Sequence, residues 1–109
     1  MRGLTILGST GSIGLSTLRV LRAFPDEFVV RGLACRGNLS ELEKQIAEFS
    51  PEAVAVVSEE VVRLSEYTAL KKQYHKTTFF EGEEGLLELA RRDADVLVSA
   101  IVGAAGLRP

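Results

Sequence analysis

Three glycines spaced three residues apart, Gly8, Gly11 and Gly14, lie in a short run that also contains several hydroxyl side chains. Glycine packs no side chain and loses more conformational freedom on folding than any other residue. Three glycines so close together predict a backbone that turns sharply and lets a ligand approach closely. The neighbouring hydroxyl groups of Thr10 and Ser12 indicate that this ligand is polar.

A strand-like apolar segment precedes this glycine-rich turn, and an amphipathic helical pattern follows it. The start of a helix presents unpaired N–H groups and the positive end of the helix dipole, which together favour phosphate binding. We therefore expect the N–H groups of Gly11, Ser12 and Ile13 to bind a pyrophosphate, with hydroxyl bonds from Thr10 and Ser12. The spacing differs at its first glycine from the G-x-G-x-x-G pattern of dinucleotide-binding domains, so a purely structural turn is the alternative.

The end of the second strand-like segment, LACRGN, bears on which dinucleotide is bound. Domains specific for NAD usually carry a carboxylate about twenty residues after the last glycine, where it binds the ribose hydroxyls. Here Arg36 occupies that place, Gly37 and Asn38 follow it, and no carboxylate lies between Glu27 and Glu41. A guanidinium can pair with a 2′-phosphate, so the sequence predicts NADP(H). The alternative is a solvated loop arginine.

Short apolar segments alternate with longer amphipathic ones along the whole chain, which predicts strands joined by helices. The expected strands are residues 4–8, 27–35, 52–58, 76–82 and 95–103, and the expected helices are residues 12–24, 38–50, 59–74 and 83–94. Strands joined through helices run parallel, and such crossovers are almost always right-handed. We therefore expect an α/β fold with a doubly wound parallel sheet, a Rossmann-like dinucleotide-binding domain.

The segment SAIVGAAG, residues 99–106, follows the last expected strand. Ligands of open α/β sheets lie at the carboxyl ends of the strands. We therefore expect Ala100, Ile101 and Val102 to line the path toward the nicotinamide. Close packing of a helix on these small residues is the alternative.

Length and composition restrict the class of protein and its partners. The chain has 109 residues, 46% hydrophobic and 26% charged, with a net charge of −2, which is typical of one globular domain and indicates neither nucleic acid nor a membrane as partner. No apolar run is long enough to span a bilayer, and a cytoplasmic location is expected. The single cysteine, Cys35, is expected to be a buried thiol, and His75 a surface residue. We predict no catalytic and no metal-binding residue in this chain.

Four segments carry a resemblance to a known family: TILGSTGSIGLSTL (residues 5–18), LACRGN (33–38), LEKQIAEFSPEAVAV (42–56) and SAIVGAAGLRP (99–109). They resemble the 1-deoxy-D-xylulose 5-phosphate reductoisomerases over essentially the whole chain. The resemblance implies an NADPH-dependent enzyme of non-mevalonate isoprenoid biosynthesis. Such an enzyme isomerises its sugar-phosphate substrate and reduces it to 2-C-methyl-D-erythritol 4-phosphate, with Mg or Mn bound. A homodimer is implied for the full-length protein.

The same resemblance implies which residues contact the cofactor: Thr10, Gly11, Ser12, Ile13, Arg36, Gly37 and Asn38. The metal-binding acids and the substrate-phosphate site of the family lie beyond the point that matches Pro109. Residues 1–109 are therefore expected to form an incomplete, truncated N-terminal NADP(H)-binding domain, without the catalytic and C-terminal domains and inactive alone. Two alternatives remain, namely the NADP-binding domain of a semialdehyde dehydrogenase or dihydrodipicolinate reductase-like enzyme, and a non-catalytic nucleotide-binding module.

Overall fold

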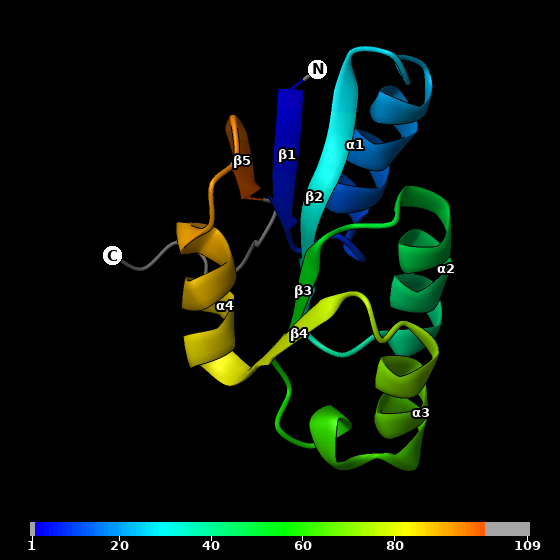
Figure 1. The fold of residues 1–109 in the computed structure, drawn as a ribbon, viewed down its shortest axis with the longest axis vertical. Helices are drawn as coiled ribbons and strands as arrows, with labels where there is room; N and C mark the ends of the chain where they lie inside the picture. Colours follow the sequence, from blue (N-terminus) through cyan, green and yellow to red (C-terminus); the bar gives the residue numbers. More distant parts are fainter. Residues whose placement is uncertain (1, 100–109) are drawn as a thin grey trace.

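The computed structural model describes residues 2–99, which form one parallel β-sheet with helices on both faces (Figure 1). The sheet order is β4-β3-β2-β1-β5, and every neighbouring pair is parallel. The strands are β1 (Arg2–Leu7), β2 (Phe28–Cys35), β3 (Ala53–Val56), β4 (Thr78–Glu81) and β5 (Val96–Ser99). The helices are α1 (Ser12–Arg22), α2 (Leu39–Phe49), α3 (Ser65–Gln73) and α4 (Gly82–Arg91), with a short 3-10 helix at Val61–Arg63. The predicted doubly wound α/β fold is confirmed.

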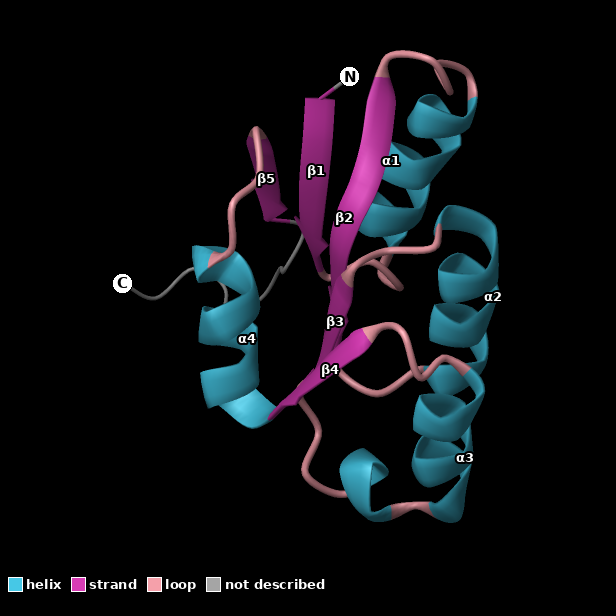
Figure 2. Ribbon diagram, in the orientation of Figure 1, coloured by secondary structure: helices cyan, strands magenta, loops and turns pink. Residues whose placement is uncertain are grey.

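The two layers of helices follow from the order of the strands. From β1 to β4 the chain moves outward across the sheet in one direction, and the connecting helices α1, α2 and α3 lie on one face (Figure 2). From β4 it returns to the far side of β1 to form β5, so a right-handed crossover places α4 on the opposite face. The direction of winding therefore reverses beside β1, at the strand that leads into the glycine-rich turn.

Alternating side chains of the strands build one core on each face of the sheet. In β3, Val54 and Val56 join the larger cluster under α1, α2 and α3, whereas Ala53 and Ala55 join the smaller cluster under α4. All four side chains are fully buried. The two alanines leave room for Leu89 of α4, which is 1% exposed. The parallel strand is thus apolar on both faces, as a strand covered by helices on each side must be.

The segment after β3 differs from the expected single helix over residues 59–74. A 3-10 helix is followed by Leu64 in an extended conformation, and α3 begins only at Ser65. Val61 and Leu70 both pack on the large core, yet in one continuous helix they would point about 180° apart. The break at Leu64 lets both face the sheet. Within residues 2–99, no helix has the length and apolar character needed to cross a membrane.

Candidate dinucleotide-binding site

The glycine-rich turn is held against the carboxyl end of β2. Gly8 has φ +87°, in the left-handed region that favours glycine. The N–H groups of Gly8 and Ser9 both donate to the carbonyl oxygen of Ala34, each at 2.8 Å. The N–H of Gly11 donates to the carbonyl of Gly8 at 3.2 Å. The turn therefore leaves the sheet in a defined direction, and the N–H of Gly11, which was expected to bind phosphate, is engaged inside the turn.

Gly14 and Gly11 serve different purposes in this turn. A Cβ at Gly14 would lie 2.2 Å from the carbonyl oxygen of Gly8 and 2.7 Å from Cα of Ser9, so no side chain fits there. A Cβ at Gly11 would meet only the oxygen of Gly8, at 3.6 Å, an ordinary contact. The close packing of α1 on the turn thus requires glycine at position 14, whereas nothing in the fold described requires it at position 11.

The start of α1 is open to a ligand. Gly11 is its N-cap, no side chain caps the helix, and its first turn contains no acidic residue. Among residues 2–99, no hydrogen-bond partner is present for the N–H of Ser12 or of Ile13, and both residues are exposed. Thr10, which is half-buried, comes just before them. Two unpaired N–H groups at the positive end of a helix are well suited to an anion.

The second expected site, residues 36–38, connects β2 to α2 at the same edge of the sheet. Asn38 is the N-cap of α2, because its Oδ1 accepts a hydrogen bond from the N–H of Glu41 at 3.1 Å. The backbone carbonyl of Arg36 accepts from the N–H of Ser58 at 2.8 Å, which ties the loop to the end of β3. The exposed guanidinium of Arg36 forms no ion pair within the part of the chain that the structure describes.

Acidic side chains line the same hollow as the predicted phosphate-binding arginine. Arg36 and Ser58 line a hollow of about 360 Å³ together with Glu59, Glu60 and Glu83. The sequence did not predict this arrangement, because the three carboxylates belong to segments after two other strands and meet only through the sheet order. Arg36 therefore lies beside negative charge and not on a broadly positive surface.

Sequence reasoning also missed a buried contact between α2 and the turn. Gln45 of α2 is 1% exposed, and its Nε2 donates to the carbonyl oxygen of Ser9 at 2.9 Å. Ser9 is itself fully buried. The only signal in the sequence is an amide between Leu42 and Ile46 on the apolar face of the helix. This contact joins the glycine-rich turn to α2, the helix that Asn38 caps.

Comparison with known proteins identifies the family. The family model described as 1-deoxy-D-xylulose 5-phosphate reductoisomerase matches residues 4–109. The chain belongs to the 1-deoxy-D-xylulose 5-phosphate reductoisomerase family. This finding confirms the resemblance and does not favour a semialdehyde dehydrogenase, a dihydrodipicolinate reductase or a non-catalytic module.

Members of this reductoisomerase family resemble the chain in sequence and in structure. The reductoisomerases of Thermodesulfovibrio yellowstonii and Geotalea uraniireducens are 46% and 49% identical to it over the whole chain, which spans 28% of their length. A crystal structure of DOX-P reductoisomerase with NADPH, fosmidomycin and magnesium matches 98% of the chain and 26% of that protein, with TM-score 0.83 and 34% identity. The Zymomonas mobilis enzyme with NADPH matches 97% of the chain and 27% of that protein, with TM-score 0.83 and 30% identity.

Other candidate residues do not form a reactive site. Burial raises the pKa of the Cys35 thiol to about 12, although a hydrogen bond from the backbone of Asn38 acts in the opposite direction. The thiol is therefore neutral near pH 7, and His75 lies exposed on the surface, as expected. Residues 2–99 contain no cluster of three or more His, Cys, Asp or Glu side chains that could hold a metal ion. Ala100, Ile101 and Val102 lie outside the described residues.

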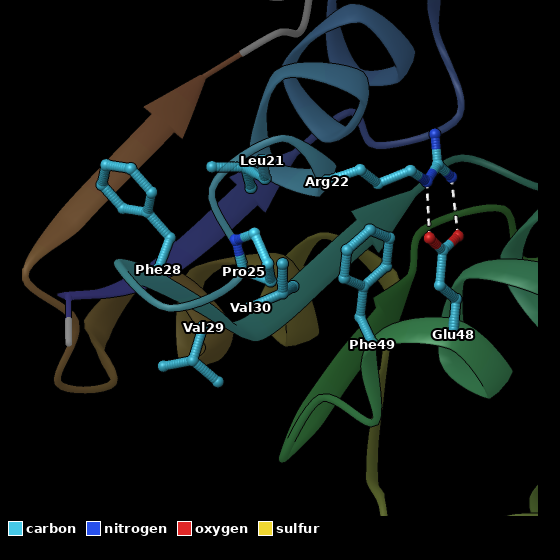
Figure 3. Close-up of a pocket in the computed structure, with 8 residues that line it drawn as sticks. All are labelled: Leu21, Arg22, Pro25, Phe28, Val29, Val30, Glu48 and Phe49. Carbon is cyan, nitrogen blue, oxygen red and sulfur yellow. Dashed lines mark hydrogen bonds and ion pairs between the residues drawn. The ribbon is translucent and has the colours of Figure 1, made fainter.

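A separate pocket lies at the opposite, amino-terminal edge of the strands (Figure 3). Phe28 and Val30 from the start of β2 line it, together with the ends of α1 and α2. Arg22 and Glu48 close one side through two hydrogen bonds, of 2.5 and 2.7 Å, and the guanidinium of Arg22 lies 5.5 Å from the ring centre of Phe49. Ligands of open α/β sheets bind at the carboxyl edge, so this pocket is not the dinucleotide site of the reductoisomerase fold.

Proposed function

We propose that this chain is the NADPH-binding part of a 1-deoxy-D-xylulose 5-phosphate reductoisomerase. The full-length enzyme would isomerise 1-deoxy-D-xylulose 5-phosphate and reduce it to 2-C-methyl-D-erythritol 4-phosphate in isoprenoid biosynthesis. The observation that carries the proposal is the position of the open helix start: α1 begins after β1, beside the point where the sheet reverses its winding. Dinucleotides bind at that point in doubly wound sheets, and similar solved structures contain NADPH.

Each predicted contact residue has a role in this proposal. The unpaired N–H groups of Ser12 and Ile13 bind the pyrophosphate, assisted by the hydroxyl of Thr10. Gly11, where the fold tolerates a Cβ, stays a glycine because the phosphates lie close to its backbone. Its N–H stabilises the turn instead of the ligand.

The loop after β2 holds the adenosine end of the cofactor. Arg36 pairs with the 2′-phosphate, and Gly37 and Asn38 contact the same end of the cofactor. Asn38 contributes in addition through its N-cap, which fixes the start of α2. When bound, the cofactor supplies the hydride for the reduction. The residues of this chain bind and orient it.

Substrate and metal are held elsewhere in this proposal. The described residues do not provide a set of acids that suits Mg or Mn, so no metal-dependent step is assigned to them. The chain covers about 28% of the length of its relatives, and we propose that residues 1–109 belong to the N-terminal cofactor domain, with the catalytic groups outside it. We also propose a cytoplasmic location and a homodimer for the full-length protein.

Calorimetry on the full-length protein tests this proposal. NADPH should bind more tightly than NADH, and absorbance at the reduced nicotinamide band should fall when 1-deoxy-D-xylulose 5-phosphate and Mg²⁺ are added. Omission of the sugar phosphate is the control, because NADPH should then persist. A protein that binds neither cofactor, or that oxidises NADPH equally well without the substrate, would show that the proposed function is wrong.

A further inference from the structure

The contact between Gln45 and Ser9 completes the restraint of the glycine-rich turn. The N–H of Ser9 donates to Ala34, and its Cα packs so closely against Gly14 that no Cβ fits between them. Its remaining backbone group, the carbonyl, receives the 2.9 Å hydrogen bond from Nε2 of Gln45. A carbonyl can only accept, so the amide nitrogen of Gln45 must face the turn.

The direction of the Ser9 carbonyl determines where the next N–H points. The peptide between Ser9 and Thr10 is planar and trans, so its C=O and its N–H point in opposite directions. Gln45 holds the carbonyl toward the buried side of α2, and the N–H of Thr10 is consequently directed away from α2. No partner for that N–H is present within residues 2–99. Thr10, like Ser12 and Ile13, thus has an N–H group that is unpaired among the described residues.

Stability alone does not explain an amide at position 45. Oε1 of Gln45 and Oγ of Ser9 are both buried without a hydrogen-bond partner among the described residues. An apolar side chain at position 45 would remove one of these two unpaired atoms but would leave the Ser9 carbonyl without its donor, so the amide gives no net gain in paired buried polar atoms. The neighbours of Gln45 on the same helix face, Leu42 and Ile46, are apolar. The amide therefore contributes something other than packing.

We propose that Gln45 is a positioning residue for the cofactor: it holds the Ser9 carbonyl so that the N–H groups of the turn face the pyrophosphate. This inference rests on the proposed function. It also links the two halves of the site, because Asn38 caps the start of α2 and Gln45 contacts the turn about two helical turns later. One helix thus sets the loop for the adenosine end and the turn for the pyrophosphate.

The test is to replace Gln45 by methionine in the full-length protein and to measure the affinity for NADPH and NADH by calorimetry. Methionine keeps the length of the side chain but cannot donate to Ser9. We expect Kd to rise about tenfold for both cofactors, since the pyrophosphate is common to them, while the melting temperature changes little. Ile46→Met, one residue further along α2 and equally buried, is the matched control, and its Kd should stay within about twofold of the unmodified protein.

Gln45→Glu adds a readout that a packing role would not change. A protonated carboxyl group can donate to the Ser9 carbonyl, whereas a carboxylate cannot. Burial raises the pKa of a carboxyl group, so the affinity of Gln45→Glu should approach that of the unmodified protein as the pH falls from about 8 to about 5.5. Gln45→Met, measured at the same pH values, corrects for protonation of the cofactor phosphate.

The outcomes separate this inference from the proposed function. The positioning role would be overturned if Gln45→Met left the Kd values unchanged. It would also be overturned if the ratio of the Kd of Gln45→Glu to the Kd of Gln45→Met did not vary with pH. Cofactor binding itself would remain intact in both cases. A larger loss for NADPH than for NADH would also overturn it, because the effect would then lie at the 2′-phosphate. If the unmodified protein bound neither cofactor, the proposed function itself would be wrong. Should Gln45→Met fold poorly, the pH dependence of Gln45→Glu decides the question.

Discussion

Replacing Gly14 by alanine should destabilise the protein through the packing of α1 on the glycine-rich turn. The new Cβ would lie 2.2 Å from the carbonyl oxygen of Gly8, whereas ordinary contacts begin at 3.4 Å, so the helix or the turn must move by about 1.2 Å. Overpacking of this kind costs about 1 to 3 kcal/mol, and the better helix propensity of alanine returns about 0.5 to 1 kcal/mol. The atoms that the new Cβ would meet belong to the backbone and cannot rotate away, so the upper end of the cost applies, and we expect a net loss of about 2 kcal/mol in the free energy of unfolding.

Urea unfolding followed by circular dichroism measures this loss, with Gly11→Ala as the matched control. A Cβ at Gly11 would make only an ordinary 3.6 Å contact, and its φ of −81° suits any residue. Gly11→Ala should therefore lose less than about 1 kcal/mol, the difference expected between glycine and alanine at an N-cap. If Gly14→Ala were as stable as Gly11→Ala, the inference that α1 packs directly on the turn would be refuted.

Three further predictions concern the cofactor and the buried thiol. Gly11→Val should lose NADPH binding in calorimetry with an unchanged circular dichroism spectrum, because its side chain would occupy the phosphate site; retained binding would place the cofactor elsewhere. Arg36→Asp should weaken NADPH binding by about 1.5 to 3 kcal/mol and barely affect NADH, and equal affinities in the unmodified protein would contradict the role of Arg36. The raised pKa of Cys35 keeps its thiol neutral in the folded protein, whereas the unfolded thiol ionises above about pH 8.5. The stabilisation from the neutral thiol is thus fully present below about pH 8.5. Above that pH the free energy of unfolding should fall by up to about 1.4 kcal/mol per pH unit, and this fall should be smaller in Cys35→Ala.

The local parts of the site were predictable from sequence because they depend on neighbouring residues. Glycine spacing after an apolar strand and before an amphipathic helix located the turn, which the structure places between β1 and α1. Asn38 is of a residue type that commonly caps helices, and the structure shows it as the N-cap of α2. In each instance the backbone conformation follows from the residue type and its immediate neighbours.

The parts that sequence reasoning missed depend on packing between distant segments. The hydrogen bond from Gln45 to Ser9 joins residues 36 positions apart, and an amide on an apolar helix face does not reveal its partner. Glu83 lies near Arg36 only because β2, β3 and β4 are neighbours in the sheet. The break at Leu64 likewise reflects the need of two separate apolar groups to reach one core.

The sheet order has a consequence for how the chain folds during synthesis. β1 is made before the other four strands of this sheet, yet it pairs on one side with β5, whose residues Val96–Ser99 emerge about ninety positions later. Until then, the N–H and C=O groups along that side of β1 have no strand partner, and an open strand edge is a template for pairing with another chain. The nascent protein is therefore prone to aggregate through this edge until β5 has been made, although the glycine-rich turn and its contact with Ala34 can form much earlier.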